Sequence, residues 1–291
     1  MTEDYKEILV KEAAALSKEY NVMAIMCCGS QNYGLDTEAS DFDTKAVVVP
    51  SFEDLVKGNQ VSKTVTFVCG ICDVKDVRLY IDNLKKQNVN YVETLFTEHI
   101  LVNPRYKDVF DILLGMREKI AVIDKERALN AMYGMLVQED EKLRKSCVAG
   151  EKEAANKHYV NVFKCALMAD KYMKYTSYDE VLDCSKIKAL RYKDLPLAEV
   201  QAHAERLKAK TKESVDHFLA SEIIMPDTDT ADWLDTWILE FLKAELITTA
   251  SPAPTAPQEK QPAVQDTEEA AEDKTTDKPK KLFGRRKKGS H

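Results

Sequence analysis

The stretch Cys27–Pro50, CCGSQNYGLDTEASDFDTKAVVVP, decides how the N-terminal part of the chain folds. The pair Gly29-Ser30 follows the apolar run VMAIMCC, and a second apolar run, TKAVVVP, follows Asp41-Phe42-Asp43. We interpret the two runs as buried strands, with a turn or short helix between them. If Asp41-Phe42-Asp43 begins the second strand, both carboxylates project from one face and Phe42 points into the core.

Two carboxylates this close repel each other, so they indicate either a bound divalent cation or a solvated acidic turn. Mg²⁺ accepts oxygen ligands and completes its shell with water and substrate phosphates. Gly29-Ser30 can offer backbone N–H groups and a hydroxyl to a phosphate. A two-metal site needs a third carboxylate. We expect it to be Asp73, at the end of the apolar strand TFVCGIC, or else Asp76, which is also expected to cap the next helix.

The remaining patterns predict an α+β fold. Tyr5–Tyr20 carries a helical apolar stripe, and residues 64–74 form a strand or a hairpin that bends at Gly70. From Pro104 onward only helical patterns occur. We therefore expect a small mixed β-sheet domain with flanking helices over residues 1–105, followed by an α-helical domain over residues 106–247. A ligand would bind in the cleft between them.

Residues 248–291 differ in composition from the rest of the chain. Residues 250–291 contain five of the nine prolines and almost no large apolar residue, which predicts disorder. The segment ends in the basic cluster KKLFGRRKK, which is either a solvated tail or a contact for nucleic acid or a protein partner. We interpret the final Gly289-Ser290-His291 as a remnant of an expression tag.

Composition limits the possible classes of function. Charged residues make up 31% of the 291 residues, and no apolar run is long enough to span a membrane. Residues 1–249 carry a net charge of −9, because residues 250–291 hold nine Lys/Arg and seven Asp/Glu. That balance does not fit a dedicated nucleic-acid binder. Acidic N-terminal residues in place of a signal peptide, with scattered cysteines, predict a cytoplasmic protein. Cys69 and Cys72 are expected to pack around a turn, since no second ligand pair suggests zinc.

The stretch GSQNYGLDTEASDFDTKAVVV resembles the signature of the polymerase-β-like nucleotidyltransferase superfamily. It is most similar to the nucleotidyltransferases associated with RNA-ligase and RNA-repair genes. Tyr33-Gly34-Leu35, Ser40–Asp43 and Lys45 carry the resemblance, and Ala46 replaces the usual glycine. A second match is Asp73 followed by a helix and by Asn88–Phe96, which includes Glu93.

A third, less complete match lies in the helical region, from Lys157 to Lys164. Asn161 stands where the family has histidine, and Lys164 where it has arginine. Lys157 and Lys164 would hold a triphosphate as point charges, or they belong to a solvated helix face. His158 is expected to be a surface or packing histidine.

The resemblance implies metal-dependent transfer of a nucleotide from an NTP, ATP by default, to an acceptor hydroxyl. It implies that Asp41, Asp43 and Asp73 bind two Mg²⁺ (or Mn²⁺) ions, with Asp73 helping the attacking group to lose its proton. Glu93 would be a supporting residue. The acceptor implied is an RNA end. Alternatives are a small-molecule or protein hydroxyl, and a non-catalytic nucleotide sensor. The implied nucleotide-binding residues are Gly29, Ser30, Lys45, Lys157 and Lys164.

Overall fold

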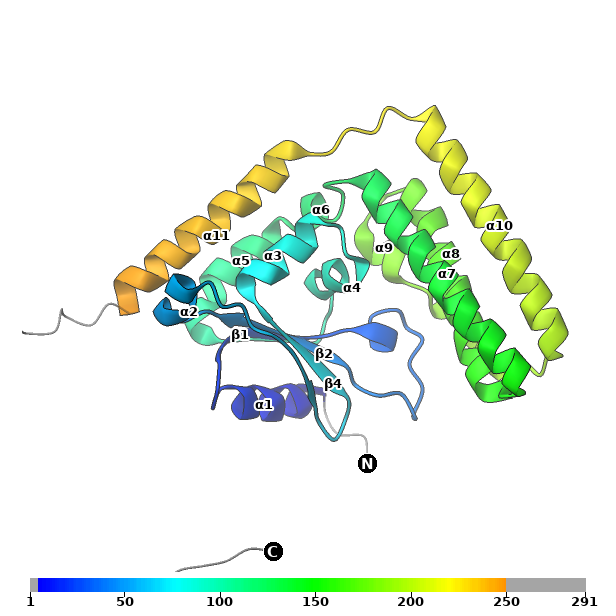
Figure 1. Ribbon diagram of the computed structural model, residues 1–291, viewed down its shortest axis with the longest axis horizontal. Coiled ribbons are helices and arrows are strands. Elements are labelled where there is room, and N and C mark those ends of the chain that lie inside the picture. The colour runs from blue at the N-terminus through cyan, green and yellow to red at the C-terminus, as the bar shows by residue number, and fades with distance from the viewer. Residues whose placement is uncertain (1–4, 250–291) are drawn as a thin grey trace, which may run out of the picture. The chain divides into compact units, whose positions relative to one another are not determined.

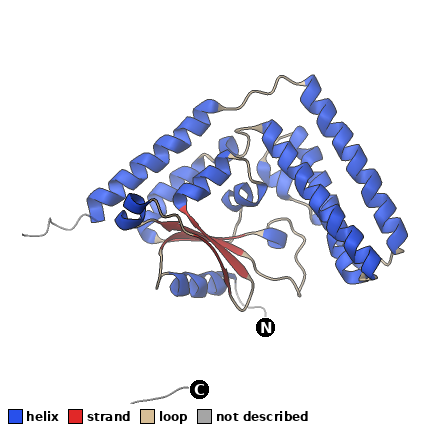
Figure 2. Cartoon of the chain, viewed as in Figure 1, coloured by secondary structure: helices blue, strands red, loops and turns tan. Residues whose placement is uncertain are grey.

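The computed structural model describes residues 5–249, and its β-strands all lie before residue 103 (Figure 1, Figure 2). They form one mixed sheet in the order β3-β4-β2-β1-β5. β2 and β4 are parallel, and the other three neighbouring pairs are antiparallel. This confirms the predicted α+β class. The strands are β1 (Asn21–Cys27), β2 (Thr44–Val49), β3 (Ser62–Thr66), β4 (Ile71–Asp76) and β5 (Ile100–Val102).

Helices cover both faces of the sheet. On one face, α1 (Tyr5–Leu16) packs in a cluster with Ala46 and Val48 of β2. On the other face, Val47 and Val49 belong to a larger cluster that includes α3 (Val77–Lys85). Figure 1 shows α1 and α3 on opposite sides of the strands. Because strand side chains alternate, the odd-numbered residues from 43 to 49 face the side of the later helices.

Residues 62–76 form the hairpin alternative predicted for this region. β3 and β4 are joined by a turn in which the Phe67 N–H donates to the Gly70 carbonyl at 2.9 Å. Cys69 lies in this turn and Cys72 is the second residue of β4, where burial raises the pKa of its thiol to about 12. A buried thiol of that kind is a packing group and not a nucleophile at neutral pH.

The expected position of Asp73 at a strand end is wrong, because TFVCGIC is divided by the hairpin turn. Asp73 is instead an interior residue of β4 and lies opposite Lys45 of β2 in the parallel register. Asp76 lies further along, opposite Val48. It caps α3 as predicted, accepting from the Arg78 N–H at 2.9 Å, and it also pairs with the Arg78 guanidinium. Of the two candidates, Asp73 is therefore the carboxylate nearer to Asp43.

The C-terminal part of the described chain is helical, as predicted. α7, α8 and α10 pack together around buried residues such as Leu136, Tyr159 and Val200. The helices are α2 (Phe52–Lys57), α4 (Val89–Val92), α5 (Lys107–Gly115), α6 (Arg117–Ile120), α7 (Lys125–Ala149), α8 (Lys152–Met173), α9 (Tyr178–Leu182), α10 (Leu197–Ser221) and α11 (Thr228–Thr249). Short 3₁₀ segments are η1 (Gly29–Gln31), η2 (Glu93–Leu95), η3 (Pro104–Tyr106) and η4 (Ser185–Tyr192).

The sheet and the helices share one hydrophobic cluster, which extends from Met23 of β1 to Phe241 of α11. The strands end close to residue 105, but the domain boundary placed there stays a prediction. The predicted disordered tail began at residue 248, but Thr248 and Thr249 belong to α11, and the rest of it, from residue 250, lies outside the described residues. Within residues 5–249, no helix combines the length and apolarity needed to cross a membrane.

Candidate functional site

The turn after β1 is built around Gly29, which has φ +82°, a left-handed conformation that favours glycine. η1 starts there and places Ser30 at the end of the strand. The Cys28 N–H donates to the Asp43 carbonyl at 2.9 Å, which ties this turn to the residues before β2. The structure therefore brings Gly29-Ser30 next to the aspartate pair, as the sequence predicts.

Asp41 and Asp43 lie just before β2, which begins at Thr44 and not at Asp41 as expected. The alternation of side chains nevertheless holds. Phe42 is 4% exposed and packs on the α1 side of the sheet, and both aspartates line one cavity. Asp43 Oδ1 accepts from the Ile71 N–H at 3.1 Å, whereas the Asp41 carboxylate has no ion-pair partner among residues 5–249.

This cavity has a volume of about 210 Å³ and lies between the strand ends, α8 and η4. It contains most of the site residues predicted from the sequence. Those that line it are Gly29, Ser30, Asp41, Asp43, Lys157 and Lys164. The cavity thus gathers residues that are more than 100 positions apart in the chain.

The wall opposite the turn comes mainly from one face of α8. Lys157, Asn161 and Lys164 are spaced by four and three residues, which places them in one row along a helix. Arg191 of η4 also lines the cavity, and its guanidinium donates to the Leu35 carbonyl at 3.2 Å. Within residues 5–249, none of the three cations forms an ion pair with a carboxylate. They are available to an anionic ligand.

A buried carboxylate lies beneath the turn. Glu93 is 2% exposed, and its Oε1 accepts from the Gly29 N–H at 3.4 Å. Burial raises the pKa of Glu93, and Lys164 and Lys45 oppose this rise. The buried Tyr33 hydroxyl also opposes the rise in pKa, although it lies outside hydrogen-bonding geometry. Glu93 therefore supports the turn from below, and the Gly29 amide is already engaged.

Asp73 and Lys45 lie beside the cavity and do not line it. Asp73 accepts a hydrogen bond from the Tyr91 hydroxyl at 2.6 Å and pairs with Lys75 at 3.1 Å. Lys45 lies over the Tyr91 ring, 5.0 Å from its centroid, and 3.8 Å from the Cys28 sulfur. Both side chains are thus engaged by neighbours, and both contact Tyr91 of α4.

The two cavity aspartates fit a hydrated divalent cation better than a complete two-metal site. Their carboxylates face one space and form no ion pairs within residues 5–249, which suits a cation that takes its other ligands from water and phosphate. In the described part of the chain, however, no three His, Cys, Asp or Glu side chains are arranged to hold a metal. Asp73, the expected third ligand, does not line the cavity, and its carboxylate is engaged by Tyr91 and Lys75.

Asn161 is fixed by a contact with α7. Its Nδ2 donates to Glu139 Oε2 at 3.0 Å, and the same oxygen lies 2.9 Å from His158 Nδ1. His158 does not line the cavity. Asn161 and Lys164 therefore both line the cavity that contains Ser30, and Asn161 is held by a carboxylate.

Arg191 and Tyr33 are site residues that the sequence did not identify as such. Tyr33 lies under Lys164, whose ammonium is 4.0 Å from the ring centroid. It could have been found from its place in the Tyr33-Gly34-Leu35 motif. Arg191 is in a short 3₁₀ segment, and its contact with Leu35 spans 156 residues, so no local spacing marks it.

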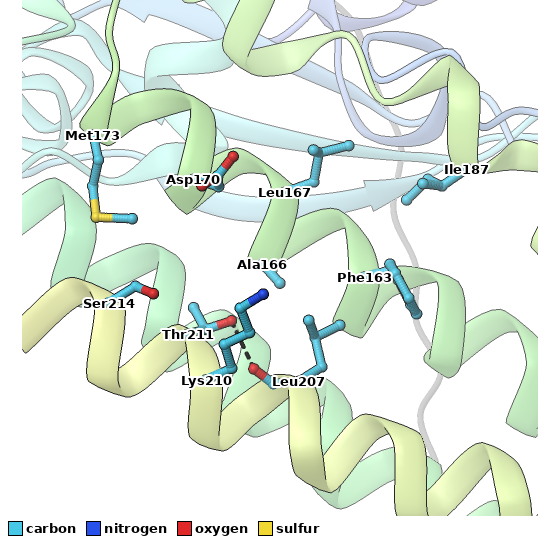
Figure 3. A pocket seen from close by; sticks show the side chains of 10 residues that line it. All are labelled: Phe163, Ala166, Leu167, Asp170, Met173, Ile187, Leu207, Lys210, Thr211 and Ser214. Atoms are coloured by element: carbon cyan, nitrogen blue, oxygen red, sulfur yellow. Dashed lines mark hydrogen bonds between the residues drawn. The ribbon is translucent and has the colours of Figure 1, made fainter.

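An apolar cavity of about 310 Å³ lies elsewhere, between α8 and α10 (Figure 3). Phe163, Leu167 and Met173 of α8 face Leu207 of α10 across it. Thr211 Oγ donates to the Leu207 carbonyl, so this hydroxyl is already satisfied. None of the predicted site residues lines this cavity.

Comparisons with known proteins give only distant structural similarity. No family model matches the chain, and no curated protein matches it. A solved structure of a nucleotidyltransferase-like protein from Exiguobacterium sibiricum 255-15 is similar over 74% of this chain and 78% of that one, with 10% identity and a TM-score of 0.35. At this distance, function has to be inferred from the residues of the chain itself.

Proposed function

We propose that this protein is a metal-dependent nucleotidyltransferase that moves a nucleoside monophosphate from an NTP to an acceptor hydroxyl and releases pyrophosphate. One observation carries the proposal. Two aspartates and three cations line the same small cavity without pairing with each other. Unpaired carboxylates and unpaired cations in one cavity suit a metal-bound polyphosphate, because its metal can bind the carboxylates while its phosphates bind the cations.

The roles of the residues follow from their positions. Asp41 and Asp43 would hold Mg²⁺, which when bound neutralises charge on the phosphates and polarises the reacting one. Ser30 donates to a phosphate oxygen from the turn, while Lys157, Lys164 and Arg191 bind the others. Glu93 keeps the turn in place through Gly29.

The transfer itself forms one bond and breaks one. The acceptor oxygen attacks the α-phosphorus, the bond from that phosphorus to the bridging oxygen breaks, and pyrophosphate leaves with the electron pair. The acceptor proton passes to a base. Asp73, on the strand beside Asp43, is the proposed base, with Tyr91 orienting its carboxylate.

The proposed donor is ATP and the proposed acceptor an RNA end, as the sequence resemblance implies. Incubation of the full chain with α-labelled NTPs, Mg²⁺ and total RNA or protein tests this. Label should appear in the RNA fraction and disappear with D41N or D43N. Label in the protein fraction would move the acceptor to a protein hydroxyl. Label in neither fraction would contradict both macromolecular acceptors.

A second candidate is a non-catalytic nucleotide-binding module. It is favoured by the state of Asp73, which is held by Tyr91 and Lys75. Such a protein would bind a non-hydrolysable NTP with Mg²⁺ and gain about 2.7 kcal/mol of stability at 100 times its Kd, without transferring label. Transfer that depends on Asp73 would exclude this candidate.

A further inference from the structure

A second cavity adjoins the candidate site and is larger. It has a volume of about 960 Å³ and shares Ala39, Lys157 and Arg191 with the smaller cavity. Its walls are the loop before Ser40, the start of α8 and the end of η4. A ligand held by Lys157 and Arg191 can therefore extend into both spaces.

Tyr192 is the aromatic residue at this larger cavity. Its side chain is 69% exposed, and it makes no hydrogen bond or ring contact with another residue of the described chain, 5–249. An aromatic ring left uncovered at the wall of a polar cavity is a surface on which a planar group can stack. Stacking of a nucleobase on such a ring contributes about 1–3 kcal/mol.

Charge decides which part of a nucleotide fits which cavity. Glu38, Glu151 and Glu153 line the larger cavity and form no ion pairs within residues 5–249. They repel a polyphosphate but accept hydrogen bonds from the N–H groups of a base. The remaining cation of this cavity, Lys152, is already paired with Asp194. Lys164 and Ser30 line only the smaller cavity.

Resting on the proposed function, we infer that the larger cavity binds the nucleobase of the NTP, stacked on Tyr192, while the triphosphate occupies the smaller cavity. Lys157 and Arg191 lie at the junction between the two parts of the nucleotide. The base is a purine with an exocyclic amino group, adenine or guanine. A purine offers the larger stacking area, and its amino group suits the carboxylate wall.

The test is calorimetric binding to the full chain with Mg²⁺ and no acceptor present. The ligands are ATP, GTP, UTP and inorganic tripolyphosphate, and the proteins are wild type, Y192F and Y192A. Wild type and Y192F should bind ATP or GTP about tenfold more tightly than tripolyphosphate. Y192A should lose this difference while keeping its affinity for tripolyphosphate. Because Tyr192 is exposed, the melting temperature of Y192A should match that of wild type.

The opposite results separate this inference from the function on which it rests. Equal affinities of wild type for ATP, UTP and tripolyphosphate, or an unchanged ATP preference in Y192A, would overturn the base site and leave the phosphate site intact. A Y192A variant that binds ATP normally but binds RNA more weakly would assign Tyr192 to the acceptor instead. Failure of wild type to bind any triphosphate would overturn the proposed function and this inference together.

Discussion

Gly70 lies directly against the backbone of Phe42, so closely that a Cβ atom on Gly70 would be 2.4 Å from the Phe42 carbonyl oxygen. The same added atom would be 3.1 Å from Asp43 Oδ1. The β3–β4 turn therefore packs on Phe42 and Asp43, the second of which carries one of the two candidate carboxylates. Only glycine allows this approach, and Phe42 N–H completes it by donating to the Cys69 carbonyl at 2.7 Å.

Replacing Gly70 with alanine should therefore disturb the site from outside the cavity. We expect G70A to lower the free energy of unfolding by about 1–3 kcal/mol, because backbone atoms must move to admit the methyl group. Nucleotide transfer should fall by more than the loss of folded protein explains. Urea denaturation and activity per folded molecule measure the two effects. The matched control is G134A, since an added Cβ at Gly134 meets no atom within 4 Å.

The buried Glu93 should make stability depend on pH. Its folded-state pKa is raised above the ordinary value of 4.5, so between that value and the folded-state pKa the folded chain binds more protons than the unfolded chain. Its contribution to stability is then complete below 4.5 and is lost as the pH rises through the folded-state pKa. The stability of wild type relative to E93Q should decline over that range in urea denaturation at a series of pH values.

Glu12 provides the control for this substitution. It is equally buried, on the α1 side of the sheet, accepts from the Thr44 hydroxyl at 2.7 Å, and has a raised pKa caused by burial. E12Q should change the pH dependence of stability in the same direction but leave triphosphate affinity unaltered. E93Q should weaken triphosphate binding, because a neutral amide oxygen holds the Gly29 N–H less strongly than the Glu93 carboxylate does. Equal triphosphate affinities in E93Q and wild type would contradict a role for Glu93 in the site.

Lys164 should contribute to nucleotide binding through charge. We expect K164A to raise the Kd for Mg²⁺–ATP about tenfold, because one phosphate contact by a cation is lost. The loss should shrink at high salt, which screens such contacts. Titration calorimetry at two salt concentrations measures both. K174A, which removes an exposed ion pair with Asp170 just past the end of α8, should leave the Kd unchanged.

Asp73 separates the catalytic proposal from the binding-module alternative. Because it lies outside the cavity, D73N should leave Mg²⁺–ATP affinity within about threefold of wild type. If Asp73 takes the proton from the attacking hydroxyl, D73N should lower the rate of nucleotide transfer by about 10²-fold or more. D76N is the control, since Asp76 lies on the same strand but caps α3. Undiminished transfer by D73N would mean that another group takes the proton.

Much of the fold was predictable because its signals are local. The alternation of side chains around Phe42 predicted which face of the sheet each aspartate occupies. Asp76 caps the next helix as expected, and of the two structures predicted for residues 64–74, the hairpin at Gly70 is the one that forms. β5 was not predicted. It has only three residues, Ile100–Val102, and pairs with β1, which lies about 75 positions earlier. This long-range pairing, and not the β-propensity of its own residues, determines the strand.

The residues of the site were predictable only where they belong to a sequence motif or follow helical spacing. Ser30, Asp41 and Asp43 come from one stretch, and Lys157 and Lys164 share a helix face. Arg191 and Tyr192 reach the same region through packing of η4 against the Gly29–Leu35 segment. Asp73 was expected at a strand end as the third carboxylate, and its place inside β4 and its hydrogen bond from Tyr91 depend on contacts between distant residues.

The division of the cavity between distant segments has a consequence for the protein during its synthesis. Asp43 leaves the ribosome 148 residues before Arg191, which corresponds to a delay on the order of 10 s. For most of that interval the carboxylates are present without the cavity cations, because the first of them, Lys157, follows Asp43 by 157 − 43 = 114 residues. The cation-lined wall of the cavity is therefore completed late in translation, when η4 with Arg191 emerges.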